Sequence, residues 1–369
     1  MKILYIAHYK ESSGWSNAAI QNVLALRSAG LDVVCRDIKL TNKEHTPDPV
    51  IEELERKDLK GVTDCIQHVL PHHICGTEKF SGKNISHYVA ESMFTQKNTW
   101  HTFLDLTDEV WVTNDTIKEN TKQFVNKPVH TIPYAFDTSV YQKEYQKIDL
   151  DHHNSSFKFY TIADINERKN IKSIIRCYYH TFKFYENTVL ILKISKYGVP
   201  EETLRQSIGQ MCQEIQNEMR MYKDVGRYPP IRIFCERVPT DTIYSIHRSC
   251  DCFVGVSHGE GWSIPAFDAM CFGNKPICSD EGGPKMFIDK NDKTSGSLIS
   301  GSYSICNQSD SAFAHIFTGS EFWFSPSEKK VCETMRERYN NRERHKSPWE
   351  LGKKYSHKVV GQQMEELLK

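Results

Sequence analysis

The sequence predicts an α/β protein with two domains, each built on a parallel β-sheet with helices on both faces. Three observations support this fold class. The chain has 369 residues, more than a single hydrophobic core usually serves. Short apolar runs that are typical of buried strands alternate with longer segments of helical periodicity. The alternation restarts near Phe157, after a polar stretch at residues 141–156 that we interpret as the linker.

The first half begins with Ile3–Ala7, which we expect to form a buried strand. A polar loop containing one glycine follows at residues 11–16. Apolar residues at helical spacing then predict a helix over residues 17–29, with Gly30 ending it. Further strands of this half are expected at Leu31–Cys35, Val62–Val69, Glu109–Thr113 and Pro128–Ile132.

The second half has the same architecture without an obvious sequence repeat. Leu and Met residues recur at helical spacing from Leu204 to Met219, which indicates a helix with one face in the core. Buried strands are expected at Phe157–Ala163, Val189–Ile194, Ile231–Cys235, Cys252–Val256 and Pro276–Cys278. In an alternating pattern of this kind, the strands pair in parallel.

The amino-acid composition limits the classes of function that we expect for the chain. Lys+Arg and Asp+Glu both number 47, so no overall charge drives the chain onto nucleic acid or an anionic membrane. No stretch approaches the ~18 apolar residues of a membrane span, and the first apolar run is too short for a signal peptide. We therefore expect a cytoplasmic protein whose 12 scattered cysteines are free thiols.

Two polar segments can be interpreted either as ordinary solvated surface or as binding sites. His152 and His153 are expected to be solvated loop residues rather than metal ligands. The Arg- and Lys-rich segment 336–369 is expected to present a solvated helix face, and a site for a polyanion is the alternative.

The most informative segment follows the strand expected at Cys252–Val256. A glycine-rich loop, His258–Ser263, leads into a helix whose first residue is expected to be Pro265, with Ser263 or Ile264 as its N-cap. The free N–H groups and the dipole at such a helix start favour a diphosphate.

Two carboxylates flank this helix start. Glu260 precedes the helix, and Asp268 lies one turn inside it. Carboxylates accept hydrogen bonds from hydroxyl groups, whereas helix amides bind phosphate. Together these groups describe a site for a sugar nucleotide.

Glu260, seven intervening residues and Asp268, set in Glu-Gly-Trp-Ser-Ile-Pro-Ala-Phe-Asp, resemble the donor motif of retaining GT-B glycosyltransferases of family 4, the glycosyl transferases group 1. The usual motif has Glu at both ends, so Asp268 is one methylene shorter. The resemblance implies that Glu260 contacts the donor sugar and Asp268 the ribose. It also implies donor contacts from the residues between them, namely Gly261, Trp262, Ser263 and Ile264.

Two further motifs resemble parts of the same family. Arg168-Lys169 is similar to the cation pair that neutralises the donor diphosphate; a solvated helix start is its alternative. The family's additional Arg is missing, because residues 163–165 are Ala-Asp-Ile. Gly14, Trp15 and Ser16 resemble the N-terminal glycine loop that approaches the diphosphate.

The candidate catalytic residues of the first half come from the same resemblance. His87 occupies a strand-end position where many members carry an active-site His, and Glu91 is a second candidate because some members have a Glu here. A buried structural His is the alternative interpretation for His87. Residues 355–368 are similar to the family's closing helix, which crosses back onto the N-terminal domain.

The resemblance implies the GT-B fold, two Rossmann-like domains facing each other across a cleft. Residues 1–150 would form the acceptor-side domain, 151–345 the donor domain and 346–369 the crossover helix. Epimerases, phosphorylases and non-catalytic nucleotide-sugar-binding modules are the alternatives. The first half has only Gly14 after its first strand, whereas an NAD-type enzyme would have Gly-x-Gly-x-x-Gly there.

The implied reaction is transfer of a sugar from a UDP- or GDP-sugar, with retention of anomeric configuration. No metal or other cofactor is expected, because Arg168 and Lys169 can stabilise the leaving diphosphate and no Asp-x-Asp is placed to bind a metal. A glycan, a lipid, a protein or a modified nucleic-acid base remains open as the acceptor.

Overall fold

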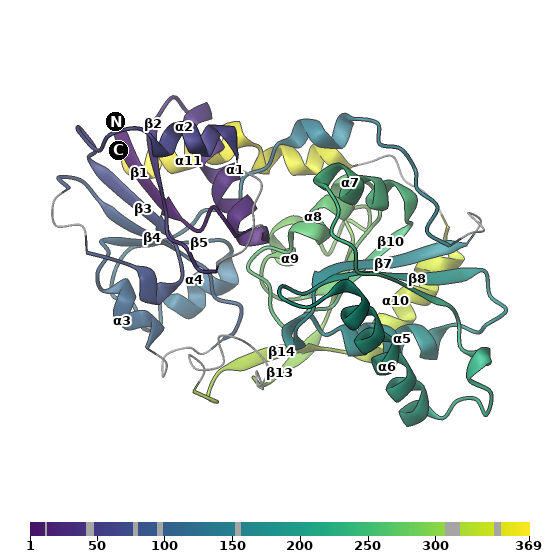
Figure 1. Cartoon of the computed structure of the whole chain (residues 1–369). Coiled ribbons are helices and arrows are strands. Elements are labelled where there is room, and N and C mark those ends of the chain that lie inside the picture. Colours follow the sequence, from purple (N-terminus) through teal and green to yellow (C-terminus); the bar gives the residue numbers. More distant parts are fainter. Residues whose placement is uncertain are drawn as a thin grey trace. The chain divides into compact units, whose positions relative to one another are not determined.

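The computed structural model divides the chain into two compact units, each with its own sheet (Figure 1). The first unit contains Met1–Val140 and Gly352–Lys369, and most of the chain from Tyr141 to Leu351 forms the second. The division therefore falls about ten residues before the expected boundary at residue 150. The structure describes residues 1–11, 13–41, 48–76, 80–93, 99–151, 156–306, 318–342 and 348–369, so His152 and His153 lie outside it.

The first unit has a six-stranded parallel sheet in the order β2-β1-β3-β4-β5-β6. The order reverses between β1 and β3, which is the switch point of a doubly wound fold. All residues of β3, β4 and β5 are buried, as expected for central strands covered on both faces. The strands are β1 (Lys2–Ala7), β2 (Asp32–Asp37), β3 (Asp64–His68), β4 (Asn84–Tyr88), β5 (Glu109–Val112) and β6 (Val129–Thr131).

Helix α1 begins three residues earlier than the sequence predicts. Ser13 is its N-cap, and its side chain accepts a hydrogen bond from the Ser16 N–H while the Ser16 hydroxyl accepts one from the Ser13 N–H. Gly14, Trp15 and Ser16 therefore form the first helical turn, and their expected place in a loop is wrong. The helices of this unit are α1 (Gly14–Ser28), α2 (Pro49–Glu55), α3 (Trp100–Leu104), α4 (Asp115–Thr121) and α11 (His357–Leu368).

Helix α11 returns from the C-terminal part of the chain and packs on α1 in the first unit (Figure 1). Val360, Met364 and Leu368 are buried in the same core as Leu26 of α1. Gly361 lies so close to α1 that a Cβ atom there would clash with the Ala25 carbonyl. The crossover helix expected from the resemblance is thus confirmed.

The second unit has a six-stranded parallel sheet in the order β12-β11-β10-β7-β8-β9. This is the strand order of a dinucleotide-binding Rossmann fold, with its switch point between β7 and β10. The strands are β7 (Phe157–Asp164), β8 (Thr188–Ser195), β9 (Ile231–Phe234), β10 (Cys252–Gly255), β11 (Ile277–Ser279) and β12 (Ser297–Ile299). Its helices are α5 (Ile171–Thr181), α6 (Glu201–Met219), α7 (Thr240–Ser249), α8 (Ile264–Cys271), α9 (Pro284–Phe287) and α10 (Glu328–Asn340).

An antiparallel hairpin of β13 (Gly301–Ile305) and β14 (Phe322–Pro326) was not predicted. All 12 cysteines are free thiols, as expected.

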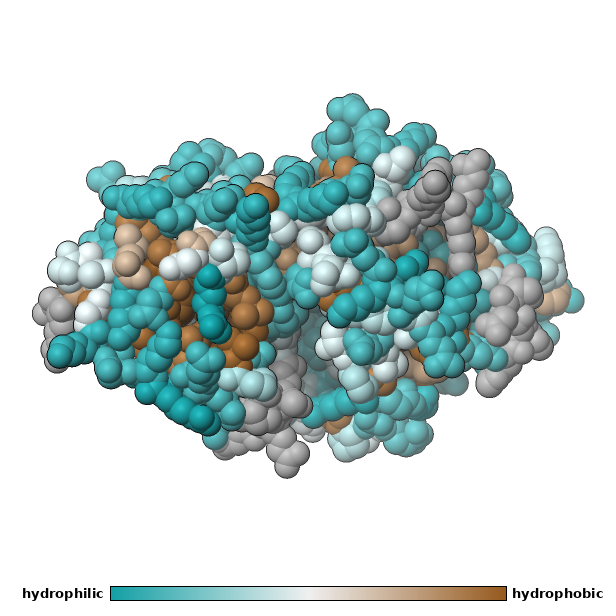
Figure 2. Space-filling view, turned by 90° about the horizontal axis from the view of Figure 1, so that it is seen from above, coloured by the Kyte–Doolittle hydropathy of each residue, from teal (hydrophilic) through white to brown (hydrophobic). Residues whose placement is uncertain are grey.

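Seen from above, the surface is largely hydrophilic, with a hydrophobic area on the side of the first unit (Figure 2). Within the described ranges, no helix combines the length and apolar character that a membrane span requires.

The close contact of Gly361 with α1 gives a test of the crossover packing. We expect Gly361→Ala to lower the free energy of unfolding by about 1–3 kcal/mol, because the added methyl group overpacks a tight helix contact. The matched control is Gly209→Ala in α6, where a Cβ would meet no atom within 4 Å. That change should stabilise by roughly 0.5–1 kcal/mol through helix propensity. Urea unfolding of both variants measures the difference, and equal stabilities would contradict the packing.

Candidate functional site

The two strongest motifs meet at the switch point of the second unit. Arg168 and Lys169 lie in a 3-10 turn, Glu167–Lys169, directly after β7, and Glu260 lies in the loop after β10. Because β7 and β10 are parallel neighbours, both loops leave the same edge of the sheet. Ligands of doubly wound folds bind at this edge, outside the carboxyl ends of the strands at the switch point.

Glu260 forms ion pairs with both cations. Lys169 Nζ lies 2.7 Å from Glu260 Oε1, and Arg168 NH1 lies 3.4 Å from Oε2. The Glu260 side chain is 8% exposed, and those of Arg168 and Lys169 are 13% and 19% exposed. Burial raises the pKa of Glu260, but the charges of Lys169 and Arg168 outweigh it and hold the pKa below its ordinary value. The carboxylate is therefore ionised at neutral pH, and the three groups together carry one positive charge.

Backbone contacts join the two loops around this cluster. The His258 N–H donates to the Arg168 carbonyl at 2.7 Å, and the Asn170 side-chain amide donates to the Val256 carbonyl at 3.0 Å. Arg168 NH1 also donates to the Gly259 carbonyl at 2.6 Å. These contacts fix the position of the cations relative to Glu260 before any ligand binds.

Two adjacent glycines, Gly282 and Gly283, pack against the backbone of the loop that carries Glu260. Gly282 has a φ of +64°, and a Cβ atom there would clash with the Glu260 carbonyl. A Cβ on Gly283 would clash with the Trp262 backbone, and the Gly283 N–H donates to the Glu260 carbonyl at 3.0 Å. We did not predict these residues. Two adjacent glycines before a proline, directly after a strand, were the available signal.

Helix α8 begins at Ile264 with Ser263 as its N-cap, one of the two predicted caps, and Pro265 is its second residue rather than its first. Ser263 adopts the left-handed conformation, with φ 71° and ψ 67°, and its side chain makes no capping hydrogen bond. Such a backbone costs a non-glycine residue about 1–2 kcal/mol. Strain of this kind is typical of a ligand-binding turn.

Asp268 is buried in α8, 7% exposed, and its Oδ1 accepts a hydrogen bond from the Tyr141 hydroxyl at 2.7 Å. Burial raises the pKa of Asp268 to about 7, against the opposing effect of the Tyr141 hydrogen bond. Tyr141 is itself buried against Phe267 and Phe272. Its contribution was missed because the sequence placed it in a linker.

In the first unit, His87 lies in the core. Its side chain is fully buried and its ring stacks on that of His68, with centroids 4.4 Å apart. Its Nδ1 lies 3.3 Å from the Asn22 side-chain amide. Burial lowers the pKa of His87 to about 3, so the imidazole is neutral. This environment corresponds to the structural alternative, whereas Glu91 follows β4 and is only partly buried.

The residues predicted to form the glycine loop, Gly14, Trp15 and Ser16, lie in the first turn of α1. Trp15 donates from Nε1 to the His68 carbonyl at 3.3 Å, across the switch point between β1 and β3. Ser16 is part of the α1 capping box, and Gly14 is exposed in the same turn. The first turn of α1 thus lies at the carboxyl edge of the first sheet.

Residues 232–311 match the family model described as "Glycosyl transferases group 1". This stretch includes Glu260, Asp268 and the pair Gly282-Gly283. No curated protein sequence matches the chain. The matched family supports glycosyl transfer as the activity of this chain.

Solved structures are similar over the full length of the chain. Sucrose-phosphate synthase from Thermosynechococcus elongatus is 13% identical with a TM-score of 0.64, and covers 100% of this chain and 98% of its own. Anabaena Alr3699/HepE in complex with UDP-glucose is 12% identical with a TM-score of 0.64, at 100% and 99% coverage. The lipopolysaccharide outer core galactosyltransferase WaaB is 12% identical with a TM-score of 0.63, at 99% and 98% coverage. The chain therefore has the GT-B fold, as the resemblance implied.

Hydrogen exchange tests the support from Gly282. We expect Gly282→Ala to increase the exchange rate of the backbone amides in residues 256–263, because the methyl group pushes against the Glu260 carbonyl. Gly198→Ala is the matched control, since Gly198 also has a positive φ, +75°, but open space around it. Both changes carry the backbone strain, and only Gly282→Ala should affect the loop. Equal protection of the loop in the two variants would show that the contact is unimportant.

Asp268 should make stability depend on pH. Its folded pKa of about 7 lies above the ordinary 3.8, so the folded chain retains a proton that the unfolded chain releases between these values. This contribution to stability is present at low pH and is lost as the pH rises through 7. Asp268→Asn stays neutral and can still accept the Tyr141 hydrogen bond.

We therefore expect Asp268→Asn to unfold at a higher Tm than the unmodified chain at pH 8, and without that advantage at pH 4. The corresponding gain in the free energy of unfolding at pH 8 should be a few kcal/mol at most, since one pKa unit corresponds to about 1.4 kcal/mol. Asp105→Asn, the same substitution at an exposed position, provides the control. A pH-independent effect of Asp268→Asn would contradict the raised pKa.

Proposed function

We propose that the chain transfers a sugar from a nucleoside diphosphate sugar to an acceptor, and that Arg168, Lys169 and Glu260 form the centre of its donor site. The single observation that supports this most is the pairing of two cations with the buried Glu260 carboxylate at the switch point of a Rossmann-like unit. A diphosphate can replace the carboxylate as the partner of the cations. Glu260 is then released toward the sugar hydroxyls.

The nucleotide would extend from this cluster along the start of α8. The Oδ2 atom of Asp268 is the proposed acceptor for a ribose hydroxyl, because Oδ1 already accepts a hydrogen bond from the Tyr141 hydroxyl. Gly261, Trp262, Ser263 and Ile264 would line the path of the diphosphate. Anabaena HepE was solved with UDP-glucose, so UDP-sugars are the first donors to test and GDP-sugars the second.

The proposed reaction retains the anomeric configuration. The bond between the anomeric carbon and the leaving phosphate oxygen breaks, and the acceptor oxygen bonds to the same face of that carbon. The acceptor proton passes to the departing β-phosphate, giving the free nucleoside diphosphate. Arg168 and Lys169 stabilise the charge that develops on this leaving group. For the first unit, His87 and Glu91 stay the proposed catalytic residues, of which His87 is fully buried and Glu91 is partly buried.

Opposite effects of the charged residues on nucleotide affinity test the site. We expect Arg168→Gln/Lys169→Gln to weaken UDP binding at least about tenfold, since each charge-assisted hydrogen bond contributes roughly 1.5–3 kcal/mol. Glu260→Gln should bind UDP as tightly or more tightly, because the cations lose their competing partner. The same variant should lose most transfer from a labelled donor, since the group that holds the sugar is altered.

Calorimetry with UDP and a transfer assay measure these effects. The matched control is Lys172→Gln/Arg176→Gln in α5, which removes the same charge outside the cluster and should leave UDP affinity unchanged. Unchanged affinity in Arg168→Gln/Lys169→Gln would place the nucleotide elsewhere. Binding without any turnover in the unmodified chain would favour a nucleotide-sugar-binding module.

We also propose that transfer needs no divalent metal, because protein cations supply positive charge at the leaving group. Across the described ranges, no group of three or more His, Cys, Asp or Glu side chains is arranged to hold a metal ion. Activity should therefore persist in EDTA. Activity that EDTA abolishes and manganese or magnesium restores would refute this proposal.

A further inference from the structure

A pocket lies in the second unit, away from the donor site. It has a volume of about 240 Å³, and its lining includes Phe157 and Cys252, the first residues of β7 and β10. Arg168 and Glu260 follow the opposite, carboxyl ends of the same two strands. The pocket and the donor cluster therefore lie at opposite ends of these strands.

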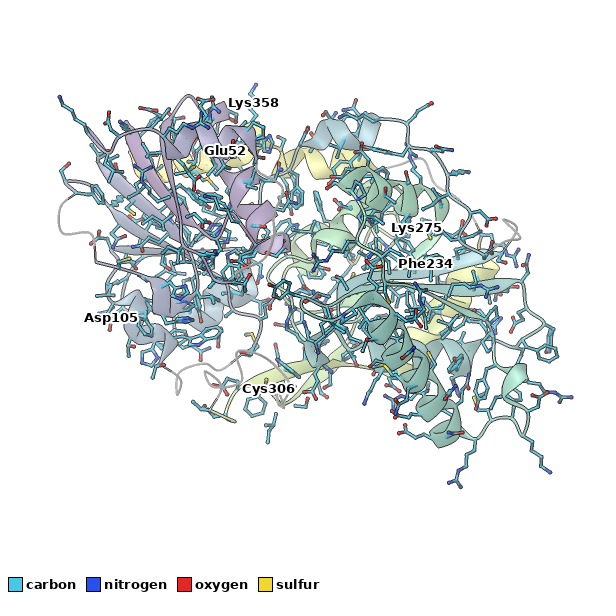
Figure 3. All side chains as sticks on the ribbon, viewed as in Figure 1. Glu52, Asp105, Phe234, Lys275, Cys306 and Lys358 are labelled. Atoms are coloured by element: carbon cyan, nitrogen blue, oxygen red, sulfur yellow. The ribbon has the colours of Figure 1, made fainter. Side chains whose placement is uncertain are left out.

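The lining of this pocket is strongly basic. Among the described residues that line it, five are cationic and only Asp251 is acidic. Asp251 already accepts a hydrogen bond at Oδ2 from the Lys158 N–H at 2.8 Å. The cations come from several parts of the unit: Lys147, Arg248 of α7, Lys275 before β11, Arg338 of α10 and Arg342. Lys275 is labelled in Figure 3.

His247, in the pocket lining, carries a hydrogen-bond donor without a partner. Asn274 donates from Nδ2 to the Tyr160 hydroxyl at 2.8 Å, so the Tyr160 proton is available to His247 Nδ1, 2.6 Å away. Burial lowers the pKa of His247 to about 3, so the ring is neutral, and with the Tyr160 hydroxyl as the donor to Nδ1 we assign its single proton to Nε2. The Nε2 atom is buried and bonds to no other described residue. A buried N–H of this kind requires an acceptor.

Arg338 has a similar unused donor. Its NH2 group donates to the Ser297 hydroxyl at 2.7 Å, whereas its Nε is buried without a partner among the described residues. The guanidinium of Arg248 lies 5.4 Å from the centroid of the Phe272 ring, which holds it at the pocket wall. One guanidinium group can donate two parallel hydrogen bonds to the oxygens of a phosphate. A volume near 240 Å³ suits a small ligand.

We propose that this pocket binds the phosphate group of a small phosphorylated molecule, independently of the nucleotide sugar. Five cations, the Nε of Arg338 and the Nε2 of His247 belong to residues that line one small cavity, and phosphate oxygens are acceptors that all of these groups can use. The basic segment from residue 336 thus contributes to an anion site through Arg338 and Arg342. This inference stands without the proposed transferase activity, because none of these residues belongs to the donor cluster.

Inorganic pyrophosphate is the probe, and calorimetry is the measurement. Because the donor cluster also binds phosphate, the titration uses Arg168→Gln/Lys169→Gln as the background. We expect this background to retain pyrophosphate binding, and we expect Arg248→Gln/Arg338→Gln added to it to weaken binding at least tenfold. Lys290→Gln/Lys293→Gln removes the same charge from exposed positions of this unit and is the control.

Three results would overturn the proposal. The background variant could bind no pyrophosphate, the Arg248 and Arg338 changes could leave affinity unaltered, or the control could weaken binding equally. Lys275→Gln, which alters a single half-buried side chain, replaces the double change if that variant does not fold, and at least a threefold loss is expected. A single-stranded oligonucleotide that binds more tightly than pyrophosphate would instead assign the surface to nucleic acid.

Discussion

The buried ion pairs of Glu260 with Lys169 and Arg168 are the interaction on which the candidate site depends. A carboxylate this deeply buried needs opposite charge nearby, since an unpaired buried ion costs several kcal/mol. The pairs therefore join the loops after β7 and β10 and keep two cations in place without a ligand. A diphosphate would compete with Glu260 for these cations, which couples nucleotide binding to release of the carboxylate.

The surrounding backbone is built to hold this cluster. Ser263 and Asn170 adopt left-handed conformations on either side of it, with φ of 71° and 54°. Gly282 and Gly283 let the Glu260–Trp262 backbone pack directly on the loop after β11. These positions cost conformational free energy, which the packing of the sheet and helices offsets. The cluster is consequently arranged before any ligand arrives, as a site that binds developing charge requires.

Sequence patterns predicted those features that depend on local order. Apolar runs predicted most strands. Residue type and spacing singled out Glu260 and Asp268, whereas the family resemblance singled out Arg168 and Lys169. Tyr141 and the glycine pair were missed because their roles arise from contacts with residues distant in sequence. The expected active-site role of His87 came from the family resemblance at a strand-end position, and the structure shows that β4 is buried along its whole length. The Ser13–Ser16 capping box was the local signal overlooked when Gly14 was placed in a loop.

A crystal structure of the chain with UDP tests the central claim most directly. We expect the diphosphate oxygens within hydrogen-bond distance of Arg168 and Lys169, with at least one ion pair to Glu260 broken and the ribose near Asp268. A diphosphate bound away from this cluster, with both ion pairs to Glu260 intact, would contradict the account.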